Sequence, residues 1–414
     1  MVTEQVTWAA SVTAGFWVGT GSRDEGEHEY GASHFLEHLL FKGTELLDAG
    51  EVARMIDRVG GDMNAFTTKE YTAFYVRMLA EDSGMGIDLL CDLLARPALR
   101  TSDFESERQV ILEEILMHGD EPGDMVHELA SEAMFGNHGL GREVLGSADS
   151  IDAMTLEGVQ SFFRHHYRPG NMVFAAAGAL DHERVLDAVG ERLEGLSGGE
   201  SPSRQPPLAA PVPFTLCSRP TEQAHLVVAT RALDRHASRR WALELLEQLL
   251  GGGVSSRLFQ EVRERRGLAY SVYADSTLYD DAGVLSVYAG TAPGKAAEVV
   301  GLLEQQLGLL AEAGCTTDEV DLAKGHFRSS MLMAMEESGS RMSWIGRNQL
   351  LLGRQLGVDE VLEQVGAVTP DDISALASEL LGQDRALTVV GPFGGRDLAP
   401  MPVSDLGPAT GEDR

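Results

Sequence analysis

The expected secondary structure has the same order on both sides of one segment, and this repetition constrains the fold more than any other feature of the chain. The segment covers residues 195–213, has no apolar period and is rich in Gly, Ser and Pro, as linkers are. On each side the residue pattern predicts an apolar strand, a helix, paired strands, long helices and a closing strand.

The ends of the two halves show the repeat best. Thr155 precedes a helix, and 23 residues later Gly178 closes the strand MVFAAAG. Thr369 precedes another helix, and 22 residues later Gly391 closes the strand LTVVG. The offset of about 214 residues between the halves indicates an old duplication. A length of 414 residues is also too great for one compact core.

These observations predict an α+β fold of two homologous domains, each a mainly antiparallel sheet with helices packed on it. The expected N-terminal domain is residues 1–196, followed by a linker at 197–213 and a C-terminal domain at 214–395. Residues 396–414 are rich in Gly, Pro and Asp, and we expect a disordered tail there.

The charge and the cysteine content exclude several classes of protein. Lys and Arg number 33 against 64 Asp and Glu, so the net charge of -31 argues against binding to nucleic acid or to an anionic membrane. It favours cationic ligands, or is a solubility adaptation. The three cysteines have no paired spacing, and we find neither an export signal nor an apolar run of roughly 18 residues. A soluble, cytoplasmic protein is expected.

The stretch GASHFLEHLLFKGT predicts a metal site on a buried helix. His34 and His38 are four residues apart and share one helical face, so both imidazoles can reach one ion. Glu37 then lies beside that ion, where it can accept a proton from bound water without being a ligand. A pair of surface histidines is the alternative, but the apolar residues around the motif disfavour it.

Two histidines leave a catalytic zinc ion one protein ligand short. The predicted helix SDFESERQVILEEILMHGD offers four carboxylates: Glu105, Glu107, Glu113 and Glu114. Glu107 and Glu114 are nearly two turns apart and share a face, with Val110 and Ile111 between them. Burial of two carboxylates is costly without a compensating cation. We therefore expect Glu114 to be the third ligand and Glu107 to hold the far ring nitrogen of a ligand histidine. Glu105 and Glu113 fit an exposed acidic face.

Two further elements are expected around the motif. Asp48 and Glu51 form a capping-box pattern for a helix that ends near Val59. Ser102 or Asp103 caps the helix of the four carboxylates. Between these helices, DMNAFTTKEYTAFYVRML is rich in Thr, Tyr, Phe and Val, which predicts two strands or one bent strand.

Together these motifs resemble the pitrilysin and insulinase metallopeptidases, particularly the branch of mitochondrial processing peptidase and its bacterial relatives. That family has a ligand Glu about 76 residues after the second histidine, and Glu114 follows His38 by 76. The similarity extends over nearly the whole chain, through GSRDE, GGDMNAFTTKE, ERQVILEEI, YRPGNM and GGGVSSRLFQEVRERRGLAYSVYA. The chain begins late compared with such relatives, without their first strand, which implies an uncovered sheet edge or a different start site.

The resemblance implies a zinc-dependent endopeptidase with one Zn²⁺ per chain in the N-terminal domain and a clam-shell dimer that encloses the active site. It also implies that the strand with Asn64, Ala65, Phe66 and Thr67 pairs with the substrate backbone. The residues alone fit an ordinary sheet strand equally well.

The resemblance further implies that Arg263 and Tyr270 complete the site, from the same chain or from its partner, by stabilising an oxyanion. From the residues alone, Arg263 is a charge on a helix surface and Tyr270 a core aromatic. The helix RRWALELLEQLLGGG of the second half has no histidine, so this domain is expected to be supporting.

The expected function is cleavage of short unstructured peptides, basic and presequence-like if the chamber shares the acidic balance of the chain. One chain carries both the metal motif and the Arg and Tyr pair, which predicts a homodimer. The alternatives are an obligate heterodimer subunit and a non-catalytic scaffold of the same family. Such scaffolds typically lack motif residues that this chain has.

Overall fold

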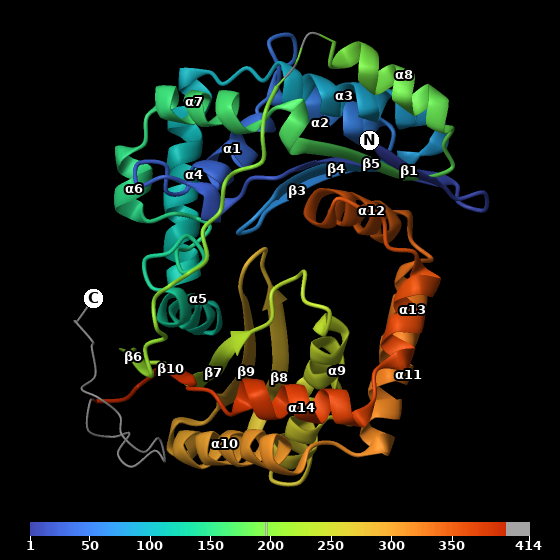
Figure 1. Ribbon diagram of the computed structural model, residues 1–414. Coiled ribbons are helices and arrows are strands. Elements are labelled where there is room, and N and C mark those ends of the chain that lie inside the picture. Colours follow the sequence, from blue (N-terminus) through green and yellow to red (C-terminus); the bar gives the residue numbers. More distant parts are fainter. Residues whose placement is uncertain (195, 197, 395–414) are drawn as a thin grey trace. The chain divides into compact units, whose positions relative to one another are not determined.

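The computed structural model describes residues 1–194, 196 and 198–394, and contains two five-stranded sheets (Figure 1). The strand order is β1-β5-β2-β4-β3 in the first sheet and β6-β10-β7-β9-β8 in the second. The first sheet consists of β1 (Val2–Gln5), β2 (Ser11–Val18), β3 (Asp62–Thr67), β4 (Thr72–Leu79) and β5 (Met172–Gly178). The second consists of β6 (Phe214–Ser218), β7 (Ala224–Ala232), β8 (Ala269–Leu278), β9 (Gly283–Thr291) and β10 (Ala386–Gly391).

The two sheets have the same topology and the same strand directions. The pairs β1 with β5 and β6 with β10 are parallel, and the remaining pairs are antiparallel. Identical order and direction in two sheets from one chain are the result expected of an internal duplication. The predicted fold class, two repeated and mainly antiparallel α+β domains, is therefore confirmed.

Helices account for most of the remaining described residues. In the first half they are α1 (Ala32–Leu40), α2 (Ala49–Arg58), α3 (Ser83–Ala95), α4 (Thr101–Gly119), α5 (Pro122–Phe135), α6 (Ala148–Ala153), α7 (Leu156–His166) and α8 (His182–Arg192). In the second half they are α9 (Arg240–Gly251), α10 (Ala296–Ala313), α11 (Thr317–Ala334), α12 (Ser338–Leu352), α13 (Val358–Ala367) and α14 (Pro370–Leu381). A π-helical segment covers Phe259–Glu264.

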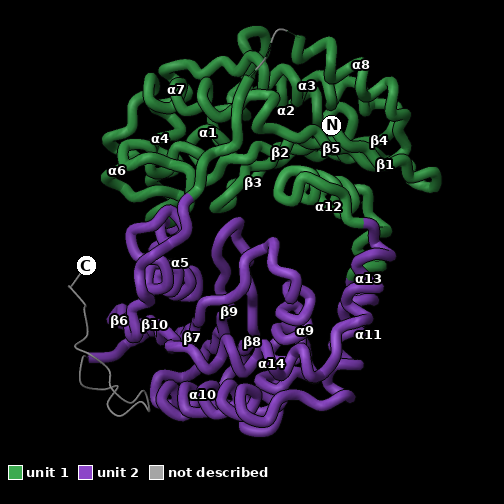
Figure 2. Tube along the Cα trace, viewed as in Figure 1, with its two compact units in different colours: residues 1–116, 143–204, 331–356 green, residues 117–142, 205–330, 357–414 purple. Residues whose placement is uncertain are grey.

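The chain divides into two compact units, and each unit includes a helix from the other half of the sequence (Figure 2). The first unit contains residues 1–116, 143–204 and 331–356, and the second contains the remainder. Helix α12 thus belongs to the unit of the first sheet, and α5 to that of the second. The boundaries expected at 196 and 214 remain predictions, and the tail expected at 396–414 lies outside the described residues.

Alternation along β2 shows how the first sheet is covered on both faces. Phe16 belongs to a core cluster with Phe35 and Leu39 of α1, whereas Trp17 belongs to a separate cluster with Met342 of α12. The Trp17 Nε1–H group lies 3.3 Å from Sδ of Met342. Side chains alternate between faces along a strand, so one strand contributes to both layers.

Helix α5 covers the second sheet in the corresponding way. Its Val126 and Ala130 form a cluster with Val227 and Ala229 of β7.

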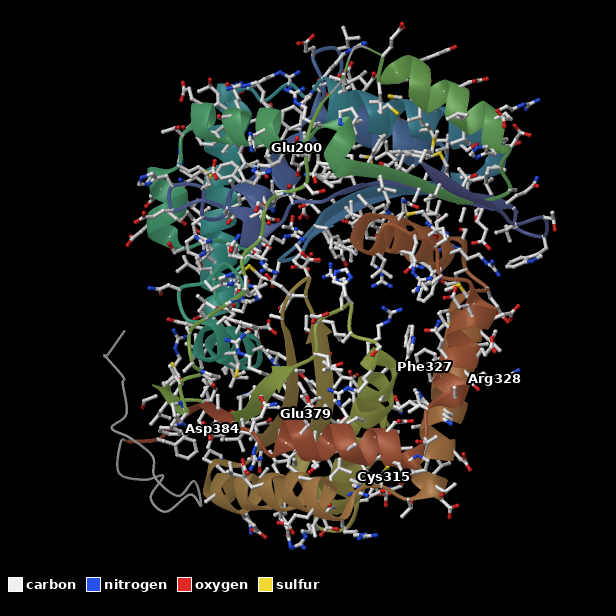
Figure 3. All side chains as sticks on the ribbon, viewed as in Figure 1. Glu200, Cys315, Phe327, Arg328, Glu379 and Asp384 are labelled. Atoms are coloured by element: carbon white, nitrogen blue, oxygen red, sulfur yellow. The ribbon has the colours of Figure 1, made fainter. Side chains whose placement is uncertain are left out.

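On α14, Glu379 forms an ion pair of 2.7 Å with Arg239, the residue that precedes α9 (Figure 3 labels Glu379). Figure 3 also labels Cys315, which like Cys91 and Cys217 forms no disulfide.

One expectation about the N-terminus is wrong. Residues 2–5 form β1, which pairs with β5 along the sheet edge that was expected to be uncovered. In the second sheet β6 occupies the corresponding edge beside β10. The strand was missed because its residues, Val-Thr-Glu-Gln, lack the apolar alternation of the strand that follows.

Local signals near the metal motif predicted its neighbouring elements, but the caps expected for α4 are wrong, because this helix begins at Thr101 and Ser102 and Asp103 lie inside its first turn. The Asp48 carboxylate accepts a hydrogen bond from the Glu51 N–H, and the Glu51 carboxylate accepts one from the Asp48 N–H, so the capping box is formed at α2. Thr369 and Asp372 form a capping box at α14, and the Thr155 side chain caps α7 by accepting a hydrogen bond from the Gly158 N–H. Among the described helices, none is both long and apolar enough to cross a membrane.

Candidate metal centre

The structure brings together the three predicted metal ligands. His34 and His38 lie on one face of α1, with ring centroids 4.6 Å apart. Their Nε2 atoms lie 3.7 and 3.5 Å from Oε2 of Glu114 on α4. One ligand atom of each residue lies within 4.8 Å of the others. In the described part of the chain, no other group of three His, Cys, Asp or Glu side chains has this geometry.

Glu107 orients one of the two histidines. Its Oε2 lies 3.0 Å from Nδ1 of His38, and its Oε1 lies 2.7 Å from Nζ of Lys42. A carboxylate only accepts hydrogen bonds, so Nδ1 of His38 is the donor and Nε2 faces Glu114. Glu107 is 4% exposed, and the Lys42 ammonium compensates its buried charge.

The environments of the two histidines differ. Burial, together with the neighbouring His38, lowers the pKa of His34 to about 4. Burial also lowers the pKa of His38, but hydrogen bonds to Glu114 and Glu107 outweigh this effect and raise the pKa overall. His34 is therefore neutral at physiological pH, which is the form of imidazole that binds a metal.

Glu37 lies next to His38 and is held by Thr67. The Thr67 hydroxyl donates a hydrogen bond of 2.6 Å to Oε2 of Glu37. Burial raises the pKa of Glu37, while this hydrogen bond opposes the shift. Thr67 was expected at a substrate-binding edge, yet its side chain contacts the predicted general base. The sequence offered no signal for this contact, because 30 residues separate the two positions.

The helix that carries Glu114 departs from one expectation. Glu107 and Ile111 are buried, but the Val110 side chain is 47% exposed and the Glu114 side chain 42% exposed. The buried stripe is therefore narrower than expected and excludes Val110, which lies one residue, or about 100° around the helix, from the buried Ile111. The Glu114 side chain is partly exposed and extends from α4 to Nε2 of both histidines on α1.

Strand β3 forms the edge of the first sheet beside this centre. Asn64 and Phe66 are exposed, and Ala65 faces the core. Oδ1 of Asn64 accepts a hydrogen bond of 2.8 Å from the Ala65 N–H. An edge strand presents main-chain groups to which a peptide can add. Pairing of Asn64, Ala65, Phe66 and Thr67 with a substrate stays a prediction.

Arg263 and Tyr270 lie in the other unit. The Arg263 guanidinium is 4.7 Å from the ring centroid of Phe259 and 4.9 Å from that of Tyr270. Tyr270 is 78% exposed, so it is not a core aromatic. It stands at a register shift between Ala269 and Ser271, where a bulge turns a side chain away from the sheet. Their participation at the metal centre stays a prediction.

Sequence comparisons assign the family. The family described as Insulinase (Peptidase family M16) matches residues 1–148, and that described as Peptidase M16 inactive domain matches residues 153–326. An uncharacterised zinc protease of Streptomyces coelicolor is 43% identical over 401 residues, which cover 95% of this chain and 87% of that protein. The chain belongs to peptidase family M16. An uncharacterised zinc protease of Bacillus subtilis shares 36% identity with this M16 protein over 396 residues, 95% of this chain and 96% of the relative.

Solved structures show the same fold. The peptidase M16 inactive domain from Pseudomonas fluorescens matches this M16 protein with a TM-score of 0.88 and 21% identity, over 95% of each chain. A protease from Helicobacter pylori matches with a TM-score of 0.85 and 22% identity, over 94% of this chain and 96% of that chain. The family models and the 43% identical relative confirm the resemblance to the insulinase metallopeptidases.

Proposed function

We propose that this M16 protein is a zinc-dependent endopeptidase that holds one Zn²⁺ per chain through His34, His38 and Glu114. The convergence of the two Nε2 atoms on the Glu114 carboxylate carries this proposal. Relatives from Streptomyces coelicolor and Bacillus subtilis that are named zinc proteases support the choice of metal.

The residues present fit a catalytic zinc site. Two imidazoles and one carboxylate form a donor set that leaves an open coordination position, as catalytic zinc sites do. Nδ1 of His38 is already engaged by Glu107, so Nε2 is the nitrogen left to bind the ion. When bound, zinc supplies Lewis acidity toward a peptide carbonyl and activates water for attack.

Glu37 has the position and the environment of a general base. It lies one residue before His38 in the same helical turn, and it is partly buried with a raised pKa. Its carboxylate accepts the proton of the attacking water and then delivers it to the leaving amine. The Thr67 hydroxyl holds one carboxylate oxygen and leaves the other for the proton transfer.

The substrate is held by the main chain of β3, next to Asn64 and Ala65, which favours extended, unfolded peptides over folded proteins. The substrate carbonyl accepts hydrogen bonds from Arg263 and Tyr270 of the same chain or of the partner chain. The net charge of -31 supports basic peptides as substrates, which cleavage of matched basic and acidic peptides at low salt tests. A cytoplasmic homodimer that encloses its substrate completes the proposal.

A metal assay combined with a fluorogenic peptide assay tests this function. The purified chain is expected to contain zinc and to cleave an unstructured peptide, and a chelator is expected to stop cleavage. Glu37→Gln is expected to retain zinc while cleavage falls by at least about 100-fold, since a general base contributes on that scale. Glu113→Gln changes an exposed carboxylate on α4 and is the control.

Two outcomes would contradict the proposal. Unchanged turnover in Glu37→Gln would remove the general base from the mechanism. A chain that folds without zinc and cleaves nothing would support the scaffold alternative. Light scattering distinguishes a homodimer from a chain that needs a different partner.

A further inference from the structure

Helix α1, which carries both histidines, begins at a residue that cannot cap it. Gly31 precedes the helix with φ of 94°, in the left-handed region. A Cβ atom at Gly31 would lie 2.7 Å from Cδ1 of Ile151 and 3.0 Å from the Leu145 carbonyl oxygen. Both the backbone angle and this close packing require glycine. The first N–H groups of a helix need acceptors, which a Ser, Thr, Asp or Asn at this position usually supplies.

A side chain from upstream supplies these acceptors. Oε2 of Glu25 accepts a hydrogen bond of 2.8 Å from the Gly31 N–H, and Oε1 accepts one of 2.8 Å from the Ser33 N–H. Glu25 is 4% exposed. A carboxylate at a helix N-terminus also interacts favourably with the helix dipole. Glu25 therefore provides a cap that the local sequence of the helix lacks.

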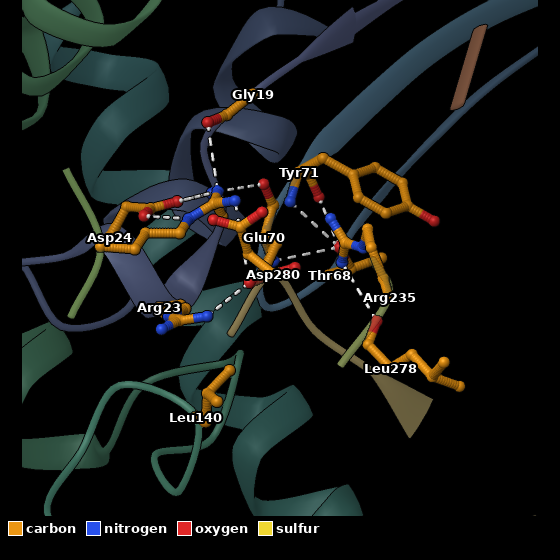
Figure 4. Close-up of polar contacts among 12 residues, drawn as sticks. Gly19, Arg23, Asp24, Thr68, Glu70, Tyr71, Leu140, Arg235, Leu278 and Asp280 are labelled. Carbon is orange, nitrogen blue, oxygen red and sulfur yellow. Dashed lines mark hydrogen bonds and ion pairs between the residues drawn. The ribbon is translucent and has the colours of Figure 1, made fainter. Parts of the chain in front are cut away.

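The loop that carries Glu25 is fixed by ion pairs within the same unit (Figure 4). The Arg204 guanidinium donates two hydrogen bonds of 2.9 Å to Asp24 and further bonds to the carbonyl oxygens of Gly19 and Glu70. Arg23 forms a buried ion pair of 2.5 Å with Glu70. The residues next to Glu25 are thus anchored, and its carboxylate is held in place.

The Glu25 cap lies beside His34, and among the described residues the ring of His34 lacks a partner like the Glu107 of His38. His34 directly follows Ser33, whose N–H group Glu25 holds. Glu107 orients the His38 ring, but no protein group in the described structure hydrogen-bonds Nδ1 of His34. The position of His34 therefore depends on where the first turn of α1 is placed. This helix has only nine residues, and helices of that length are marginal without tertiary contacts.

We infer that Glu25 is a positioning residue of the metal centre, which fixes the first turn of α1 and thereby the place of His34. This inference rests on the proposed zinc site. Glu25 acts through the backbone, by its hydrogen bonds to the Gly31 and Ser33 N–H groups.

Glu25→Gln tests the inference, because the amide keeps one acceptor oxygen but turns an NH₂ group toward the second N–H. Zinc affinity, measured by competition with a chelating dye, is expected to weaken about tenfold, as for partners that orient metal ligands. Hydrogen exchange of the Gly31 and Ser33 amides in the metal-free protein is expected to be faster by a similar factor. Neither measurement depends on peptide cleavage.

Glu29→Gln is the matched control. Glu29 lies in the same loop, and its carboxylate also accepts a backbone hydrogen bond, from the Gly26 N–H at 2.9 Å. The substitution removes the same charge without affecting the start of α1 through its side chain. Zinc affinity and the exchange of Gly31 and Ser33 should stay at the wild-type values.

The possible results separate this inference from the proposed function. Wild-type zinc affinity in folded Glu25→Gln would overturn the role of Glu25 and leave the zinc site intact. A wild-type chain that binds no zinc would overturn the proposed function, and the inference with it. If Glu25→Gln fails to fold, amide hydrogen exchange of the wild-type protein tests the cap instead. Unprotected Gly31 and Ser33 amides would refute the cap, and protected ones would support it.

Discussion

Glu107 accepts a hydrogen bond from Nδ1 of His38 at 3.0 Å, and the two residues are 69 positions apart in the sequence. The second oxygen of Glu107 lies 2.7 Å from the ammonium of Lys42. Lys42 follows α1, so one buried carboxylate joins the metal helix to α4 at two points. This arrangement both orients the imidazole and compensates the buried negative charge.

Glu107→Gln is expected to weaken zinc binding by about tenfold. The amide oxygen can still accept the Nδ1–H bond, but the negative charge that strengthens the imidazole as a ligand is lost. Competition with a chelating dye measures the affinity, and Glu113→Gln serves as the control on the same helix. Equal affinities in the two variants would contradict the orienting role of Glu107.

Glu114→Gln is expected to remove most of the stabilisation that zinc gives to the fold. Zinc at about 100 times its dissociation constant should raise the free energy of unfolding of the wild-type chain by about 2.7 kcal/mol. The amide is a much poorer metal ligand, so the variant should gain far less. Denaturant unfolding with zinc and with a chelator measures both values, and an equal gain in the variant would exclude Glu114 as a ligand.

Thr67→Val is expected to lower kcat/KM by about tenfold while zinc content stays unchanged. Its hydroxyl donates the 2.6 Å hydrogen bond to Glu37, and hydrogen bonds to charged groups contribute about 1.5–3 kcal/mol. Thr67→Ser retains the hydroxyl and should restore most of the activity in the same peptide assay. Unchanged kcat/KM in Thr67→Val, which keeps the methyl group and lacks only the hydroxyl, would contradict the role of this hydrogen bond.

Glu247 on α9 should make the stability of the fold depend on pH. Burial raises its pKa from 4.5 to about 7, against the opposing hydrogen bond from Ser276. Between these two values the folded chain binds a proton that the unfolded chain lacks. The stabilisation from that proton is complete below the unfolded pKa of 4.5 and is lost as the pH rises through about 7.

Glu247→Gln removes this dependence and keeps an acceptor for the Ser276 hydroxyl. Relative to the wild type, the variant should gain up to about 3 kcal/mol in free energy of unfolding between about pH 5 and pH 8. Urea unfolding at both pH values measures the gain, with the exposed Glu363→Gln as control. A gain no larger than that of the control would contradict the raised pKa.

Features that depend on neighbouring residues were predictable from the sequence. The four-residue spacing of His34 and His38 places them on one face of any helix, and the capping box of Asp48 and Glu51 forms from residues three apart. The repeated order of strands and helices predicted two similar sheets. Each of these follows from backbone geometry over a few residues, which the order of residue types determines by itself.

Other features were decided only by the tertiary structure. Helix α12 packs on Trp17 across 325 residues, Glu25 caps α1 in place of a local cap, and Thr67 turns to Glu37. Val110 is exposed, although the helical periodicity predicted that it would lie on the buried face. These contacts join segments whose separation along the chain carries no periodic signal. They are set by which surfaces fit together once the sheets and helices have formed, because packing depends on shape and burial across the whole unit.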